Sequence, residues 1–317
     1  MYENSSQSVS TSSQKLLKGN NLVRLNVTTA LVQVLVWPFI YINIFMFYVF
    51  LKKHTLRAEP RYVLFAQNLI GDAAFLLMTN FVVVMMHVNL LLPISVCIPY
   101  VLVMGMLTQV SPNVIVTMCL ERYVAICMPL RHVSIFSPSR TQIVVAMVWI
   151  FSFLKPLIDL IIFLTMVSRS YFSQLNFCYY EILYLQSWQR ELRSHLAIAN
   201  IAVITLMLIF IYGSIITVAR RASEKNKQTA SKAQRTLLLH AVQLLLCTLK
   251  AFTPYVEAQI ISVNIDLYVV VRYFNFLSFD ILTRSLSPMI YGFRDEKFCS
   301  AVKYYARCRA TPIVSSK

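Results

Sequence analysis

The sequence predicts an all-α membrane protein, a seven-transmembrane helix bundle with a short amphipathic helix after the last span. Composition is the first indication, since 58% of the 317 residues are hydrophobic and 13% are charged, about half the charged share of a soluble domain. The second is seven apolar stretches, each long enough to cross about 30 Å of hydrocarbon as a helix of about 20 residues. The third is the gathering of Lys and Arg in alternate connecting segments.

Each predicted span is bounded by polar segments. The first follows a tail rich in Ser and Asn, which we expect to be disordered, and basic loops at 52–61, 129–140 and 219–235 precede the second, fourth and sixth. The spans are Val27–Leu51, Tyr62–Met86, Cys97–Cys119 with an extension to Met128, Thr141–Val167, His195–Val218, Thr236–Val263 and Tyr268–Tyr291. We therefore divide the chain into an N-terminal tail (1–25), a transmembrane domain (26–292) and a C-terminal amphipathic helix and tail (293–317).

The distribution of basic residues predicts the orientation. The three basic loops and the segment after 293 together hold 18 Lys and Arg, whereas the opposite set of segments holds 6. The positive-inside rule then places the N-terminus outside the cell and the C-terminus in the cytoplasm of a multi-pass plasma-membrane protein. The net charge of +16 is explained by basic loops that face anionic membrane lipids, so no nucleic-acid partner is expected.

Candidate modification sites agree with this orientation. Asn4 and Asn26 begin glycosylation sequons on the outer side, although Asn26 lies close to the membrane. Cys299 and Cys308 follow the last span on the inner side, where they are either palmitoylation sites or plain reduced thiols.

Two cysteines are predicted to form a disulfide. Cys97 begins the third span and Cys178 lies in the loop before the fifth, both on the outer, oxidising side. The other cysteines and the five His follow no metal-binding or catalytic spacing, and no phosphate loop is present. We therefore expect no metal, no cofactor and no enzymatic activity.

An acid–base pair ends the third span. Glu121, Arg122 and Tyr123 stand at the predicted cytoplasmic boundary, where the two charges can neutralise each other. The chain thereby resembles the rhodopsin-like (class A) G-protein-coupled receptors, whose third helix ends in Asp/Glu-Arg-Tyr. Cys97 lies 25 residues before Arg122, the usual distance in that family. Further family landmarks fall at Asn43, Asp72, Trp149, Tyr212, Pro288 and Tyr291.

A finer resemblance is to olfactory receptors. "ERYVAICMPLRH" resembles their "DRYVAICxPLxY" signature, and "RTLLLHAVQLLLC" with "IYGFRDEK" resembles the fish-type odorant receptors labelled 131-2-like. The chain departs from the mammalian pattern, because "SKAQRTLLLH" replaces "KAFSTCxSH", Ser287 replaces Asn before Pro288, and the second outer loop carries only Cys178. "AFTPY" also stands in span six where the wider family has Cys-Trp-x-Pro.

The resemblance implies a mechanism. Agonist binding on the outer side would open the inner ends of spans five and six, so that Arg122 leaves Glu121 for Tyr212 or a heterotrimeric G protein of the stimulatory, olfactory type. Pro254 and Pro288 would kink spans six and seven, because proline removes a backbone donor, or they only shape packing.

Charged residues also lie within the spans. Arg284 lies four residues before Pro288 and is expected to pair with Asp72, at the level where the family holds a sodium site; Asp280 is the competing partner. Lys155 and Asp159 stand four apart on span four, as a structural or a functional pair. Lys250 and Glu257 in span six stand two turns apart, too far for direct contact.

The outer third of the bundle is the expected ligand site. Its mostly apolar lining suits a small organic odorant held by packing and one or two polar contacts. The candidate residues are Met104, Thr108, Gln109, Tyr255, Gln259 and Leu277. Met104 and Leu277 are alternatively ordinary packing residues, and Glu257, if it turned inward, would favour a cationic ligand. After the last span, Phe293, Phe298 and Val302 predict an amphipathic helix over 293–305 with these residues facing lipid.

Other functions were weighed. A non-olfactory class A receptor for another small ligand is the main alternative, although an amine receptor would need an acid where Met104 stands, 18 residues before Arg122. A transporter or channel would show related halves or Gly-interrupted helices, and the sequence shows neither. A membrane enzyme would need a cluster of His or carboxylates, which is missing.

Overall fold

The structure is a computed structural model that describes residues 22–222 and 265–306, together with six isolated positions between them (245, 249, 252, 253, 256 and 260). Several predicted features lie outside the described residues: Asn4 in the N-terminal tail, Cys308 near the C-terminus, and Lys250, Pro254, Tyr255, Glu257 and Gln259 in the sixth span.

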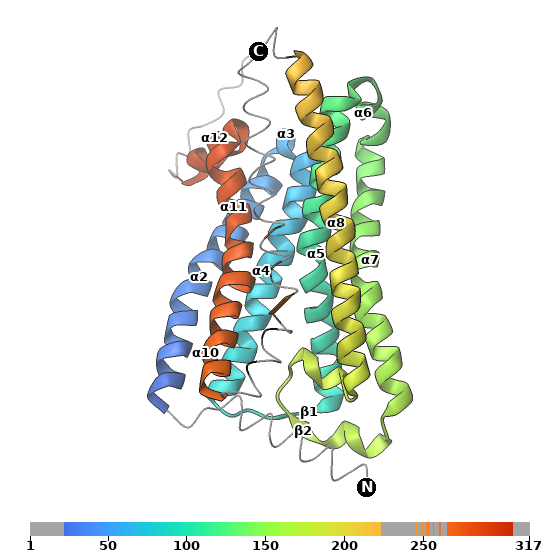
Figure 1. Cartoon of the computed structure of the whole chain (residues 1–317). Helices are drawn as coiled ribbons and strands as arrows, with labels where there is room; N and C mark the ends of the chain where they lie inside the picture. Colours follow the sequence, from blue (N-terminus) through green and yellow to red (C-terminus); the bar gives the residue numbers. More distant parts are fainter. Residues whose placement is uncertain are drawn as a thin grey trace.

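The described chain is a bundle of long helices joined by short segments (Figure 1). Figure 1 shows α3, α6 and α12 at one end of the bundle and the strands β1 and β2 at the other. The elements are α2 (Leu22–Lys52), α3 (His54–Arg57), α4 (Pro60–His87), β1 (Leu92–Pro93), α5 (Ile94–Cys127), α6 (Pro129–Ile135), α7 (Pro138–Met166), η1 (Arg169–Ser173), β2 (Leu175–Asn176), η2 (Tyr180–Leu183), α8 (Ser187–Ala222), α10 (Ile265–Asn275), η3 (Phe276–Ile281), α11 (Leu282–Arg294) and α12 (Glu296–Ala306).

The first five predicted spans correspond to α2, α4, α5, α7 and α8. Within the described residues, these five helices are long and apolar enough to cross a membrane. The helices extend past the predicted apolar limits; α8, for example, begins at Ser187 rather than at His195. The reason is that helical backbone hydrogen bonds do not depend on lipid, so polar turns can continue a helix into water.

The seventh predicted span, Tyr268–Tyr291, forms three consecutive pieces. These are α10, the wide π-helical segment η3 and then α11. Pro288 lies buried inside α11, where its ring cannot donate the backbone hydrogen bond of a regular helix. Together these elements carry the chain from the β1–β2 end to α12 (Figure 1).

Proline and serine residues mark where helices begin. Pro60, Pro129 and Pro138 each occupy the first turn of α4, α6 and α7, where the missing N–H costs no helical hydrogen bond. Ser137 also caps α7, since its Oγ accepts a hydrogen bond from the Arg140 backbone N–H at 3.4 Å.

The largest apolar core lies between α2, α4, α5, α7 and α8, and α12 closes it at one end. Its packing is tight where α4 meets α5. A Cβ added at Gly71 would lie 3.1 Å from Cγ1 of Val110, closer than most side-chain contacts. A glycine at this position therefore allows the two helices to approach.

Helix α12 differs from its sequence prediction in two ways. It begins at Glu296 instead of 293, because Asp295 caps it: Asp295 Oδ1 accepts the Phe298 N–H at 2.9 Å. The prediction that Phe298 and Val302 face lipid is wrong. Phe298 is fully buried, with its ring centroid 6.0 Å from Tyr62 and 5.4 Å from Phe65, and Val302 packs against the same core. An aromatic residue at this position therefore fastens α12 to α4.

Phe298→Ala should detach α12 from the bundle and lower the thermal-unfolding midpoint of the purified protein, since removal of a buried Phe costs about 3–5 kcal/mol. Tyr304→Ala is the control, because Tyr304 lies on the same helix and is 48% exposed. Equal losses of stability in the two variants would contradict the proposed packing role.

Candidate functional site

A buried ion pair joins α11 to α4. Nη1 of Arg284 lies 2.8 Å from Oδ1 of Asp72, and the two side chains are 5% and 0% exposed. The pairing matches the sequence expectation, since Asp72 holds the guanidinium. Asp280, the competing partner, is half-buried on η3.

The same pair is tied to α5 by hydrogen bonds. Asn68 donates to Oδ2 of Asp72 at 2.7 Å, and Ser111 on α5 donates to Oδ1 of Asn68 at 3.0 Å. Nη2 of Arg284 approaches the Leu107 carbonyl oxygen at 3.4 Å. One side of the guanidinium lies over the Phe75 ring, with Cζ 3.6 Å from the centroid. Three helices therefore share one buried polar network.

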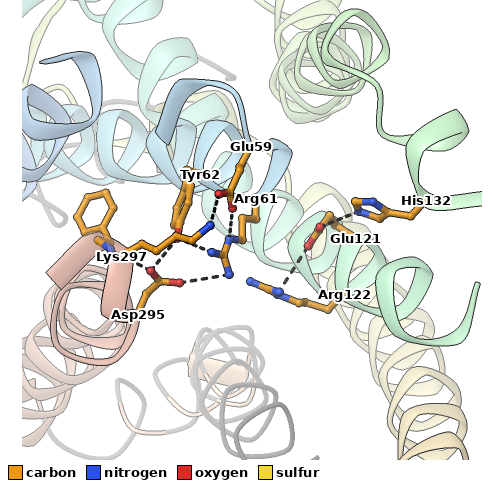
Figure 2. A network of polar contacts seen from close by, with 9 residues as sticks. Glu59, Arg61, Tyr62, Glu121, Arg122, His132, Asp295 and Lys297 are labelled. Atoms are coloured by element: carbon orange, nitrogen blue, oxygen red, sulfur yellow. Dashed lines mark hydrogen bonds and ion pairs between the residues drawn. The ribbon is translucent and has the colours of Figure 1, made fainter. Parts of the chain in front are cut away.

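The acid–base pair predicted at the end of the third span has an additional partner. Nε of Arg122 lies 3.7 Å from Oε2 of Glu121, an ion-pair distance longer than a hydrogen bond. The other oxygen, Oε1, lies 3.0 Å from Nε2 of His132 on α6 (Figure 2). Glu121 is buried, so this histidine provides the hydrogen bond that the carboxylate needs.

A second polar group at the same end of the bundle links the start of α4 to α12. Tyr62 donates to Oδ1 of Asp295 at 2.7 Å, and Arg61 pairs with both Asp295 (3.3 Å) and Glu59 (3.0 Å). Lys297 adds an exposed contact to Glu59 at 2.8 Å (Figure 2). These contacts and the Phe298 packing hold α12 against α4.

At the opposite end, a disulfide ties the segment before α8 to α5. Cys97 and Cys178 are bonded, as the sequence predicted. Next to the disulfide, Leu92–Pro93 of β1 and Leu175–Asn176 of β2 form an antiparallel pair. The loop between α7 and α8 is therefore attached at two points near the N-terminal end of α5.

A third attachment lies deeper and involves charges. Asp159 on α7 accepts hydrogen bonds from Lys155 at 2.9 Å and from the hydroxyls of Tyr180 and Tyr184 at 2.9 and 2.7 Å. The Tyr180 ring lies against Gly105 on α5, where an added Cβ would collide with the ring and lie 3.0 Å from Cγ of Pro156. The Lys155–Asp159 pair thus has a structural role, since it holds η2 between α5 and α7.

Comparison with known proteins identifies the family. Residues 42–291 match the model of the 7 transmembrane receptor (rhodopsin family). The chain belongs to this receptor family. Odorant receptor 131-2 of Danio rerio is 38% identical over 280 residues, which cover 87% of this chain and 85% of that protein. Olfactory receptor 4B13 of Mus musculus is 22% identical over 203 residues, or 60% of this chain and 61% of that protein.

Membership excludes several of the alternatives. The protein is a multi-pass membrane receptor and not an enzyme, transporter or channel, because the family consists of receptors that respond to ligands and act on G proteins. Within the described residues, no group of three or more His, Cys, Asp or Glu could hold a metal ion.

Four of the predicted ligand residues lie within the described part of the chain, on α5 and η3. Met104, Thr108 and Gln109 are half-buried on α5, and the Thr108 hydroxyl donates to the Met104 carbonyl oxygen at 2.9 Å. Gly105, against which the Tyr180 ring packs, lies next to them. Leu277 packs instead against the apolar cluster that includes Val36, which favours its alternative role as a packing residue.

The remaining predicted residues take the following positions. Asn43 is buried and donates to the Phe39 carbonyl oxygen at 2.8 Å, and Trp149 donates to Gln67 at 3.1 Å. The other described residues are Asn26, exposed on α2; Tyr123, whose ring lies 5.7 Å from that of Phe210; Tyr212, half-buried on α8; Tyr291 on α11; and Cys299, half-buried on α12.

Several functional contacts were not predicted from sequence. His132, Tyr180 and Phe75 each contact a predicted charged residue, but none shares a helical face with its partner by simple spacing. The available signal was a carboxylate within a predicted span, since Glu121 and Asp159 each require hydrogen-bond donors that their own helices do not fully supply.

Asp72→Asn should lower the surface expression and thermal stability of the receptor far more than Asp280→Asn. Loss of the Asp72 charge leaves the buried Arg284 guanidinium uncompensated, at a cost of about 3–5 kcal/mol. Both variants replace a carboxylate with an amide of similar shape, so each is a control for the other. A greater loss of expression and stability in Asp280→Asn would show that Asp280, and not Asp72, compensates the Arg284 charge.

Proposed function

We propose that the protein is an odorant receptor that binds a small organic ligand in the outer helix bundle and activates a stimulatory, olfactory-type G protein. The single observation that carries the olfactory assignment is the 38% identity to Odorant receptor 131-2 of Danio rerio across 87% of the chain. The olfactory-type signature around Glu121, Arg122 and Tyr123 supports it.

The proposed topology has seven spans, with the N-terminus outside and the C-terminus in the cytoplasm. The bias of Lys and Arg toward the α3, α6 and α12 end supports this orientation. The disulfide at the β1–β2 end supports it as well, because disulfides persist on the oxidising side of the membrane. In this topology α12 lies along the cytoplasmic surface of the plasma membrane and Asn26 faces outside, as Asn4 does by sequence.

The proposed ligand site lies beside α5, on the side of η2 that faces the middle of the bundle. Met104, Thr108 and Gln109 line it from α5, with Tyr255 and Gln259 expected to line it from span six. We expect η2 to lie between the site and the outside, since the disulfide at Cys178 and the Tyr180–Asp159 hydrogen bond hold this segment against α5 and α7. Such a mostly apolar lining with few hydroxyl and amide groups suits a small, neutral odorant.

The proposed G-protein surface is the cytoplasmic end of the bundle. It includes Arg122 and Tyr212, with Arg220, Arg221 and Arg235 from the basic third loop and its approach. On α6, Leu130 is 97% exposed and Val133 is 76% exposed, so apolar side chains are available beside the switch. A cyclic-AMP screen of an odorant panel in cells that express the chain tests the function as a whole.

Arg122→Ala should preserve surface expression and abolish the cyclic-AMP response to any agonist found, because the arginine would be the group that meets the G protein. Arg57→Ala is a matched control, since Arg57 is exposed on α3 at the same end of the bundle. A full response from Arg122→Ala would contradict the proposed coupling mechanism.

Thr108→Val and Tyr255→Ala should each shift the dose–response curve of a confirmed agonist to higher concentration, by about tenfold for one lost hydrogen bond or ring contact. Thr165→Val serves as a control, because Thr165 has the same hydroxyl chemistry and lies exposed near the end of α7. If both site variants leave the curve unshifted, the ligand lies elsewhere.

A further inference from the structure

The proposed function gives no role to His132, a polar residue at the cytoplasmic end of the bundle. His132 stands on α6, outside the Glu-Arg-Tyr motif, and Nε2 of its ring lies 3.0 Å from Oε1 of Glu121. The ring also stacks on Phe136, which is buried, with centroids 5.8 Å apart. Two contacts therefore fix the ring, one to α5 and one to the end of its own helix.

Glu121 is bound more closely by His132 than by Arg122. The histidine is at hydrogen-bond distance from Oε1, whereas Nε of Arg122 is 3.7 Å from Oε2 (Figure 2). The carboxylate is 5% exposed, so water contributes little to its solvation. The strength with which Glu121 holds Arg122 consequently depends on what His132 does at the other oxygen.

We propose that His132 is a positioning residue of the switch, which sets how firmly Glu121 retains Arg122 and makes receptor activation sensitive to cytoplasmic pH. The proposal rests on the proposed coupling of Arg122 to a G protein. A neutral imidazole donates one hydrogen bond to Glu121 and leaves the carboxylate charge for Arg122. A protonated imidazole takes up part of that charge and repels the guanidinium.

The charges around His132 favour this direction of the effect. Glu121 and Arg122 face it from α5; Arg131 on its own helix is exposed; and Arg140 on α7 donates a hydrogen bond to the Ser134 carbonyl oxygen at the end of α6. Three of these four groups are cationic. A proton on His132 therefore adds a positive charge beside Arg122 at the one carboxylate that both residues contact, and the longer contact, that of Arg122, is released.

The test compares nucleotide exchange on a purified stimulatory G protein, without agonist, catalysed by purified receptor in lipid nanodiscs. Exchange by the wild type should rise about threefold between about pH 7.6 and about pH 6.4, relative to His132→Gln at each pH. His132→Gln keeps a hydrogen-bond donor without a titrating charge, so it should give low exchange at every pH. His132→Leu removes the hydrogen bond that orients the Glu121 carboxylate toward Arg122, so this variant should give raised exchange at every pH.

His54→Gln is the matched control, because His54 is an exposed histidine on α3 at the same end and should behave as the wild type. A wild-type pH profile parallel to that of His132→Gln would overturn the proposal, as would His132→Leu with wild-type exchange. Rescue by Gln but not by Leu separates positioning from a general effect on folding.

A second readout separates this inference from the proposed coupling. If the wild type shows no exchange above empty nanodiscs, coupling to that G protein fails. The thermal-unfolding midpoints of the wild type, His132→Gln and His132→Leu then decide the inference, since they need no G protein. His132→Leu should unfold at a lower temperature than the other two, because the buried Glu121 carboxylate loses a hydrogen-bond donor. Equal midpoints for His132→Gln and His132→Leu would overturn the inference.

Discussion

The ion pair between Arg284 and Asp72 is the constraint on which the arrangement of the bundle depends. Both side chains are almost fully buried, so neither charge can be solvated by water if the partner moves away. A buried pair seldom adds stability over apolar residues, but it requires α4, α5 and α11 to meet in one register, because the Leu107 carbonyl and Ser111 complete the network. Arg284 thus places a fixed positive charge beside Asp72.

Helix α5 connects that constraint to each end of the receptor. At the β1–β2 end it bears Cys97 and Gly105, near which η2 is held, and the half-buried residues of the proposed ligand site lie next to Gly105. At the opposite end it bears Glu121, whose carboxylate contacts both Arg122 and His132. A ligand that shifts α5 against its neighbours would therefore act on the buried pair and the switch along a single rigid element.

Residue chemistry explains what could be predicted from sequence. The length of the apolar stretches predicted the five spans that the structure describes as long helices. The chemistry of an oxidising compartment predicted the Cys97–Cys178 disulfide, and the cost of burying a lone charge predicted the pairing of Arg284 with Asp72. Contacts made by connecting segments were missed, because their backbone path follows no period: His132 reaches Glu121 from a loop helix. The predicted orientation of Phe298 toward lipid was wrong for a related reason. The apolar face of an amphipathic helix packs equally well on lipid or on a neighbouring helix, and the sequence pattern alone does not distinguish the two.

A double-mutant cycle on the buried pair tests the central claim most directly. Thermal-unfolding midpoints would be measured for purified Asp72→Asn, Arg284→Gln, the double variant and the wild type. If the pair sets the register of the bundle, each single variant leaves a buried charge alone, and the double variant is more stable than the sum of the single losses predicts, by about 1–3 kcal/mol of coupling. Additive losses, with no coupling between the two positions, would contradict the account.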